Sequence, residues 1–168
     1  MQVVTRNVTG SGTVAGQIVP TVSQTAAGTN IVVSGDYSST KFFVGEKFSF
    51  EYQFSQQYLQ LTSAQSRTAV KEGRLQIRNW TVTYDNTGHF KVEITPQARS
   101  TTTEIFNGAT VGSGTVNGIN LEDGNYTFAV QSRNEGLVVK ITNDEYLPCS
   151  FVNAEWQGYY NQTSTSSS

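Results

Sequence analysis

The sequence has 168 residues, which fits one domain, and charged residues make up only 14% of it. The net charge is -2 and Lys and Arg form no run, which argues against a sequence-specific duplex-binding protein. One cysteine, Cys149, excludes an intrachain disulfide, and no stretch approaches the roughly eighteen apolar residues of a membrane span. The first residues also lack the basic and apolar regions of a signal peptide, so we expect no standard export.

The N-terminal residues 1–35 are rich in Gly and Thr, and we expect them to be extended or to join the sheet. "GSGTVAG" at 10–16 nearly recurs as "GSGTVNG" at 112–118, but the flanks diverge, so we interpret both as Gly-rich turns. The predicted β domain then covers 36–162. The remaining residues, 163–168, form a polar tail with nothing to bury.

The first clear strand signal lies in "FFVGEKFSFEYQF", residues 42–54. Apolar residues alternate there with polar ones, which is typical of a half-buried strand. The face predicted to turn inward carries four aromatic residues: Phe48, Phe50, Tyr52 and Phe54.

The segment "RLQIRNWTVTYDNTGHFKVEI", residues 74–94, predicts a hairpin. A three-residue loop closed by Gly88 in the left-handed conformation would pair Asp85 with the only histidine, His89. The same register places six apolar residues on one face: Trp80, Val82, Tyr84, Phe90, Val92 and Ile94. The alternation changes phase just before Trp80, which predicts a β-bulge near Arg78 and Asn79.

Three further strands are predicted at 101–106, 125–132 and 136–142, with a turn at "SRNEG" between the last two. Their inward residues should be Tyr126, Phe128, Val130, Leu137, Val139 and Ile141. No long window has helical spacing. The predicted fold is all-β, an antiparallel β-sandwich or barrel-like domain with hairpins and little or no helix.

The C-terminal run "NDEYLPCSFVNAEWQGYYNQ" is rich in aromatic residues. Alternation places Trp156 inward and Tyr159 outward, and three interpretations stay open: core, subunit interface, or sugar-stacking platform. The candidate interface residues are Tyr159, Tyr160, Glu155 and Gln157.

Catalytic chemistry finds little support in the sequence. A nucleophile would need a base, yet nothing around Cys149 and His89 matches a signature for such a pair. A metal would need ligands beyond His89, and carboxylates for glycoside hydrolysis stand in no recognisable site. We therefore expect no catalytic residues, no cofactor and no metal site.

Two motifs carry a family resemblance: G-R-L-Q-[IL]-R-x-W-x-[VL]-x-Y-x-x-[ST]-G within 73–96, and L-P-x-x-F-x-x-A-E-W-x-G-x-Y within 141–164. Together with "KFFVGEKFSFEYQFSQQYLQ" at 41–60, they resemble the C-terminal region of the tail nozzle proteins of short-tailed bacteriophages, also called tail tubular protein B. The resemblance covers roughly residues 36–164.

This resemblance implies a structural virion protein, made in the host cytoplasm and assembled as a sixfold homo-oligomeric ring in the tail. Its partners would be the adaptor ring and fibres, and genome DNA would pass without sequence-specific binding. Members of the family are several times longer, with propeller-like regions that this chain lacks. A piece of a nozzle, one part of a split nozzle and a compact relative all stay open. The alternative functions are a carbohydrate- or receptor-binding β-sandwich and, third, a glycoside hydrolase.

Overall fold

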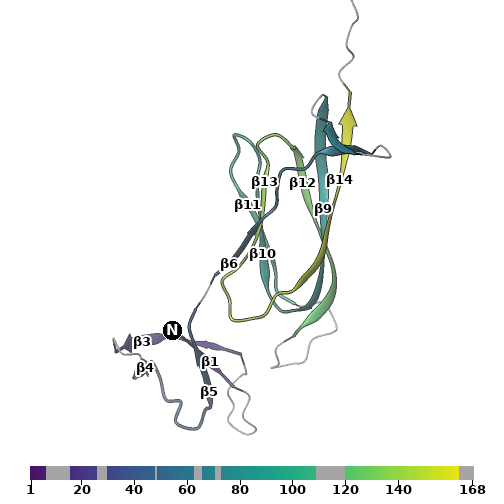
Figure 1. The fold of residues 1–168 in the computed structure, drawn as a ribbon. Coiled ribbons are helices and arrows are strands. Elements are labelled where there is room, and N and C mark those ends of the chain that lie inside the picture. Colours follow the sequence, from purple (N-terminus) through teal and green to yellow (C-terminus); the bar gives the residue numbers. More distant parts are fainter. Residues whose placement is uncertain are drawn as a thin grey trace, which may run out of the picture.

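The computed structural model describes residues 1–6, 16–25, 30–47, 49–62, 66–70, 73–108 and 120–162, and these contain no helix. The fold is all-β with antiparallel strand pairing (Figure 1), which confirms the predicted fold class. The Gly-rich runs and the polar tail lie outside the described residues, apart from Gly16.

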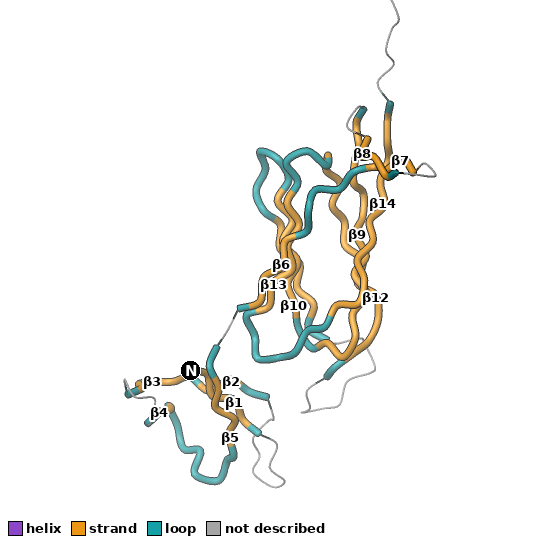
Figure 2. Tube along the Cα trace, viewed as in Figure 1, coloured by secondary structure: helices purple, strands orange, loops and turns teal. Residues whose placement is uncertain are grey.

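Two sheets form a β-sandwich, and Figure 2 shows them as two layers. One sheet has the strand order β11 (Thr102–Phe106), β10 (Phe90–Thr95), β13 (Val138–Asn143) and β6 (Phe50–Gln53). The other has the order β12 (Glu122–Arg133), β9 (Arg74–Thr87) and β14 (Phe151–Asn161), so the long strand β9 is central and β14 is an edge.

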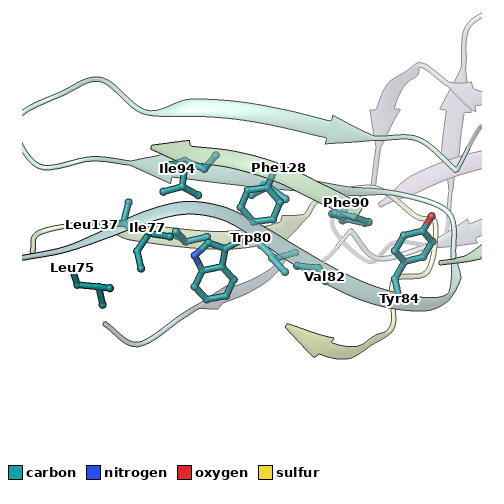
Figure 3. Close-up of a cluster of buried hydrophobic side chains, with 13 residues drawn as sticks. Leu75, Ile77, Trp80, Val82, Tyr84, Phe90, Ile94, Phe128 and Leu137 are labelled. Carbon is teal, nitrogen blue, oxygen red and sulfur yellow. The ribbon is translucent and has the colours of Figure 1, made fainter. Parts of the chain in front are cut away.

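The core lies between these two sheets (Figure 3). Inward residues of every predicted core strand meet there, and ring pairs such as Phe54–Trp80, with centroids 4.5 Å apart, span the interior. Phe90 is fully buried beneath several such rings. The buried cluster consists of Leu75, Ile77, Trp80, Val82, Tyr84, Phe90, Val92, Ile94, Phe128, Val130, Leu137, Val139 and Ile141.

Smaller sheets flank the sandwich. One small sheet consists of β2 (Ile18–Val19), β1 (Gln2–Thr5) and β5 (Phe42–Gly45), in that order. A second consists of β3 (Thr21–Gln24) paired with β4 (Ile31–Val33). Both lie beyond one end of the sandwich (Figure 1), and the Tyr146 hydroxyl links the parts by donating to the Gly16 carbonyl. At the other end β7 (Leu59–Thr62) pairs with β8 (Arg67–Val70). Strand β5 pairs with β1, so the N-terminal sheet includes residues beyond 36. The domain boundary predicted at residue 36 stays a prediction.

The predicted hairpin between β9 and β10 is wrong. Strand β9 pairs with β12 and β14, whereas β10 pairs with β11 and β13, so the chain crosses from one sheet to the other. Gly88 is not at positive φ; that conformation belongs to Asn86, at 46°. Asp85 therefore does not face His89 across a ladder.

The crossing is stabilised by the segment before β14 instead of by a hairpin partner. The Gly88 N–H donates to the Pro148 carbonyl at 2.9 Å, and the Ser150 N–H donates to the Thr87 hydroxyl at 3.0 Å. All six residues expected on the inner face are nevertheless buried. Alternation decides which side of a strand faces the core, and this result is the same for a hairpin and for a crossing between sheets.

The stretch 42–54 is also not one strand. Strand β5 belongs to the N-terminal sheet and β6 to the sandwich. Phe50 and Phe54 pack against the core as predicted, but Tyr52 is 54% exposed. Phe48 lies outside the described residues.

The predicted bulge is confirmed. Along β9 and β14 the register passes from Asn79↔Gln157 to Ile77↔Gly158, so Arg78 is the extra residue. Opposite Arg78, strand β12 carries two residues between Ala129 and Ser132. This double irregularity lets Leu75 and Ile77 face the same core as Trp80.

Candidate subunit interface

The outer face of the β12–β9–β14 sheet carries three of the four predicted interface residues, Glu155, Gln157 and Tyr159. Its side chains are polar and connected in rows across the strands. The Thr81 and Thr127 hydroxyls lie 2.9 Å apart, and the Thr83 hydroxyl donates to Asn125 Oδ1 at 2.7 Å. These bonds join β9 to β12, and β14 is an edge strand on the other side of β9.

Tyr159 projects from this face and is 58% exposed. Its hydroxyl accepts a hydrogen bond from Arg78 Nη1 at 2.8 Å, and the guanidinium carbon lies 5.9 Å from the ring centroid. The bulge turns Arg78 outward, so the bulge itself supplies the partner of Tyr159. The ring is therefore fixed in position while most of its surface stays available, as an interface aromatic requires.

Glu155 and Gln157 lie on the same exposed face as Tyr159, where alternation predicted them. The Asn153 amide donates to Glu155 Oε1 at 2.9 Å. Glu155 and Gln157 thus precede Tyr159 on the same face of β14 and add polar groups to it, as at the rim of a protein interface.

Tyr160 lies on the opposite side of β14 and packs against the core. Its ring covers Gly73, where an added Cβ would lie 2.7 Å from the Tyr160 hydroxyl oxygen. Gly73 also has φ of 92°, a conformation that side chains disfavour. Tyr160 thus serves the fold of this chain, and its assignment to an interface is not supported by its packing.

Trp156 faces inward from β14, opposite Trp80 of β9, and packs against the core. Its partly buried ring agrees with the predicted orientation. Of the three interpretations of the C-terminal run, core packing describes Trp156 and Tyr160, whereas an exposed role fits Tyr159.

His89 is buried, with 6% of its surface exposed, and Nδ1 lies 2.9 Å from Asn107 Oδ1. Its Nε2 has no hydrogen-bond partner. Cys149 packs against the hydrophobic core. Within the described part of the chain, no three His, Cys, Asp or Glu residues are grouped to hold a metal ion.

The actual neighbour of Asp85 is Asp123, a contact that the sequence analysis missed because the two residues lie in different strands. A side-chain hydrogen bond with Asp123, together with repulsion between the two carboxyls, raises the pKa of Asp85. The Asn86 N–H donates to Asp123 Oδ1 at 2.6 Å. This end of the sandwich therefore carries concentrated negative charge.

Residues 2–167 match the family described as bacteriophage nozzle protein. The chain belongs to this family. The match extends over nearly all of the 168 residues, including the N-terminal segment for which the sequence motifs gave no relative. This membership makes the nozzle chain a structural component of the phage tail, as the motifs predicted.

A similar protein is the tail tubular protein gp12 of Escherichia phage T7, which is 30% identical over 131 residues. The aligned part covers 76% of the nozzle chain but 16% of the T7 protein. The nozzle chain thus spans about a sixth of the length of this curated relative. No helix in the described ranges is long and apolar enough to cross a membrane.

Proposed function

We propose that this chain is a non-enzymatic building block of the tail nozzle, forming part of the wall of the DNA ejection channel in a homo-oligomeric ring. The observation that carries the proposal is the family match over residues 2–167. A sixfold ring, contacts with the adaptor ring and fibres, and passage of genome DNA without sequence-specific binding complete it. The protein would be made in the host cytoplasm and act in the virion tail.

The core and the outer face of the sandwich support a role as a structural subunit. The sandwich has its own continuous core, so it can keep its shape without a partner. One sheet then offers a hydrogen-bonded outer face with β14 at an edge and Tyr159 exposed on it. An exposed aromatic ring on a polar face is suited to contact a neighbouring subunit.

The test replaces Tyr159 by Ala and measures both folding and incorporation into tails. We expect the free energy of unfolding to change by less than about 1 kcal/mol because the side chain is exposed. Association should weaken roughly 5- to 30-fold, as truncation of an interface aromatic costs about 1 to 2 kcal/mol. Mass spectrometry and electron microscopy of purified particles would report occupancy.

Two control variants sharpen this test. Tyr159→Phe keeps the ring and removes only the bond from Arg78, so it should assemble nearly normally. Ile105→Ala truncates another exposed apolar side chain, 53% exposed, on the opposite sheet. Full tail occupancy by a folded Tyr159→Ala protein would contradict the proposed interface.

A further inference from the structure

A polar hollow lies over the end of the β12–β9 pair that is remote from Asp85. Three adjoining depressions form it, and they share Gln131 as a lining residue. Four arginines come from three parts of the chain: Arg74 and Arg78 from β9, Arg99 from the loop after β10, and Arg133 from β12. Four of the chain's eleven basic residues thus gather on one surface.

Among the residues that the structure describes, none of these four arginines forms a salt bridge. The ion pairs in the described ranges are Lys91–Asp144 and Lys140–Glu51, both outside the hollow. Arg78 donates to the Tyr159 hydroxyl, which leaves its charge uncompensated. Glu135 is the acidic residue of the lining, so positive charge exceeds negative charge there.

The backbone around the hollow is held in uncommon conformations. Gln131 has φ of 45° within the β12 irregularity opposite Arg78, and Ala98, beside Arg99, has φ of 56°. Such residues persist only where the surroundings determine them, and they concentrate at binding sites. Here they present Gln131 and Arg99 to the same open surface.

The lining indicates which class of partner fits. It offers guanidinium, amide and hydroxyl donors, the set that contacts the phosphates and sugars of nucleic acids. A protein interface would instead be centred on buried aromatic or apolar anchors. The exposed apolar residues Ile105, Leu121 and Val152 lie outside the hollow. The candidate interface residue Tyr159 lines only the depression beside Arg78, whereas Arg74, Arg99 and Arg133 line depressions that contain no aromatic residue.

We propose that this arginine hollow, lined by Arg74, Arg78, Arg99 and Arg133, binds the phosphate backbone of DNA without reading its sequence. The identification of the polyanion as DNA rests on the proposed role in the ejection channel. Sequence independence follows from the contacts themselves, because phosphate oxygens carry no sequence information. Four phosphate contacts would give weak, strongly salt-dependent binding.

Fluorescence anisotropy with two labelled 20-base-pair duplexes of unrelated sequence tests this on the full chain. Equal affinities are expected, with log K falling against log salt concentration at a slope of about -0.9 per phosphate contacted. The double variant Arg99→Gln/Arg133→Gln should weaken both duplexes alike and reduce the magnitude of the slope by about 2. Arg6→Gln, in the segment following β1, is the matched control and should change neither.

Glu135→Gln removes the negative charge from the hollow and should strengthen binding. Thermal melts establish that each variant is folded. The proposal is overturned if neither duplex binds at 20 mM salt, or if the double arginine variant binds like the parent. Binding of poly-glutamate but not of DNA would assign the hollow to an acidic protein segment instead.

This assay is independent of assembly into tails. Loss of DNA binding by a protein that still enters tails would defeat the arginine hollow alone. DNA binding by a protein that never enters tails would defeat the proposed nozzle role.

Discussion

The sandwich and the N-terminal sheets bury their apolar residues very differently. Thirteen residues of the sandwich form one buried cluster. In the described part of residues 1–45, the buried apolar residues are Val3, Val4 and Val19. Six large apolar side chains of the same region are exposed: Met1, Ile18, Val22, Val32, Phe43 and Val44.

This difference indicates that the sandwich is stabilised by its own core, whereas the N-terminal sheets have little core of their own. Strands β9 and β10 carry large rings that fill the space between two sheets, whereas β3 and β4 form an isolated pair, which is marginally stable in water. We expect the sandwich to supply most of the cooperative stability. The N-terminal sheets should be the less protected region in hydrogen exchange.

The largest test of this difference in stability between the two regions is to truncate Trp80, which is 3% exposed at the centre of the core. Trp80→Ala should lower the free energy of unfolding by about 3 to 5 kcal/mol, because it leaves a large cavity. Phe43→Ala, at a site 59% exposed on β5, should change it by less than about 0.5 kcal/mol. Denaturant titrations of both variants measure the two effects, and similar losses would show that the regions share one core.

A smaller effect should come from adding one methyl group to each region. A Cβ at Gly158 would lie 2.4 Å from the backbone oxygen of Gln76, at the register shift between β9 and β14. Gly158→Ala should therefore destabilise the protein by about 1 to 3 kcal/mol, because backbone must move. At Gly45 of β5 no atom lies within 4 Å of an added Cβ.

Gly45→Ala is consequently the matched control, and we expect its unfolding free energy to stay within about 0.5 kcal/mol of the parent. A neutral Gly158→Ala would mean that the two strands can separate locally without loss of packing.

The sequence identified the inner faces of these strands but not their partners. Alternation placed Trp80, Val82, Phe90 and Val92 inward correctly. It failed at Thr87–His89, because a hairpin and a crossing between sheets require the same alternation. The crossing is distinguished from a hairpin by hydrogen bonds to the carbonyls of Pro148 and Ser150. These residues lie about sixty positions away in the sequence, so the local pattern around Thr87 could not predict them.

Of the two candidate surfaces, the sequence predicted the one on β14 but not the arginine hollow. Exposure of Tyr159 and inward packing of Trp156 follow from the local pattern of β14. The gathering of Arg74, Arg99 and Arg133 depends on long-range pairing and on the loop after β10, so the absence of a basic run in the sequence did not exclude a basic surface. The Asp85–Asp123 contact arises equally from two strands distant in sequence.

The smallest predicted effect concerns this acidic contact and its dependence on pH. Because Asp123 raises the pKa of Asp85 above its ordinary value of 3.8, the folded state holds the Asp85 proton more tightly than the unfolded state. The stability gained from that proton is fully present below pH 3.8 and is lost as pH rises through the raised pKa. Asp85 therefore opposes folding at neutral pH.

Asp85→Asn should raise the melting temperature slightly at pH 7 and leave it nearly unchanged at pH 3, where the carboxyl is protonated in both states. Asp36→Asn is the opposite control within the N-terminal region, since a hydrogen bond from the Ser38 N–H lowers the pKa of Asp36. That carboxylate favours folding above pH 3.8, so its removal should not stabilise the protein at pH 7. A lower melting temperature for Asp85→Asn at pH 7 would show that the Asp85 charge has a stabilising partner.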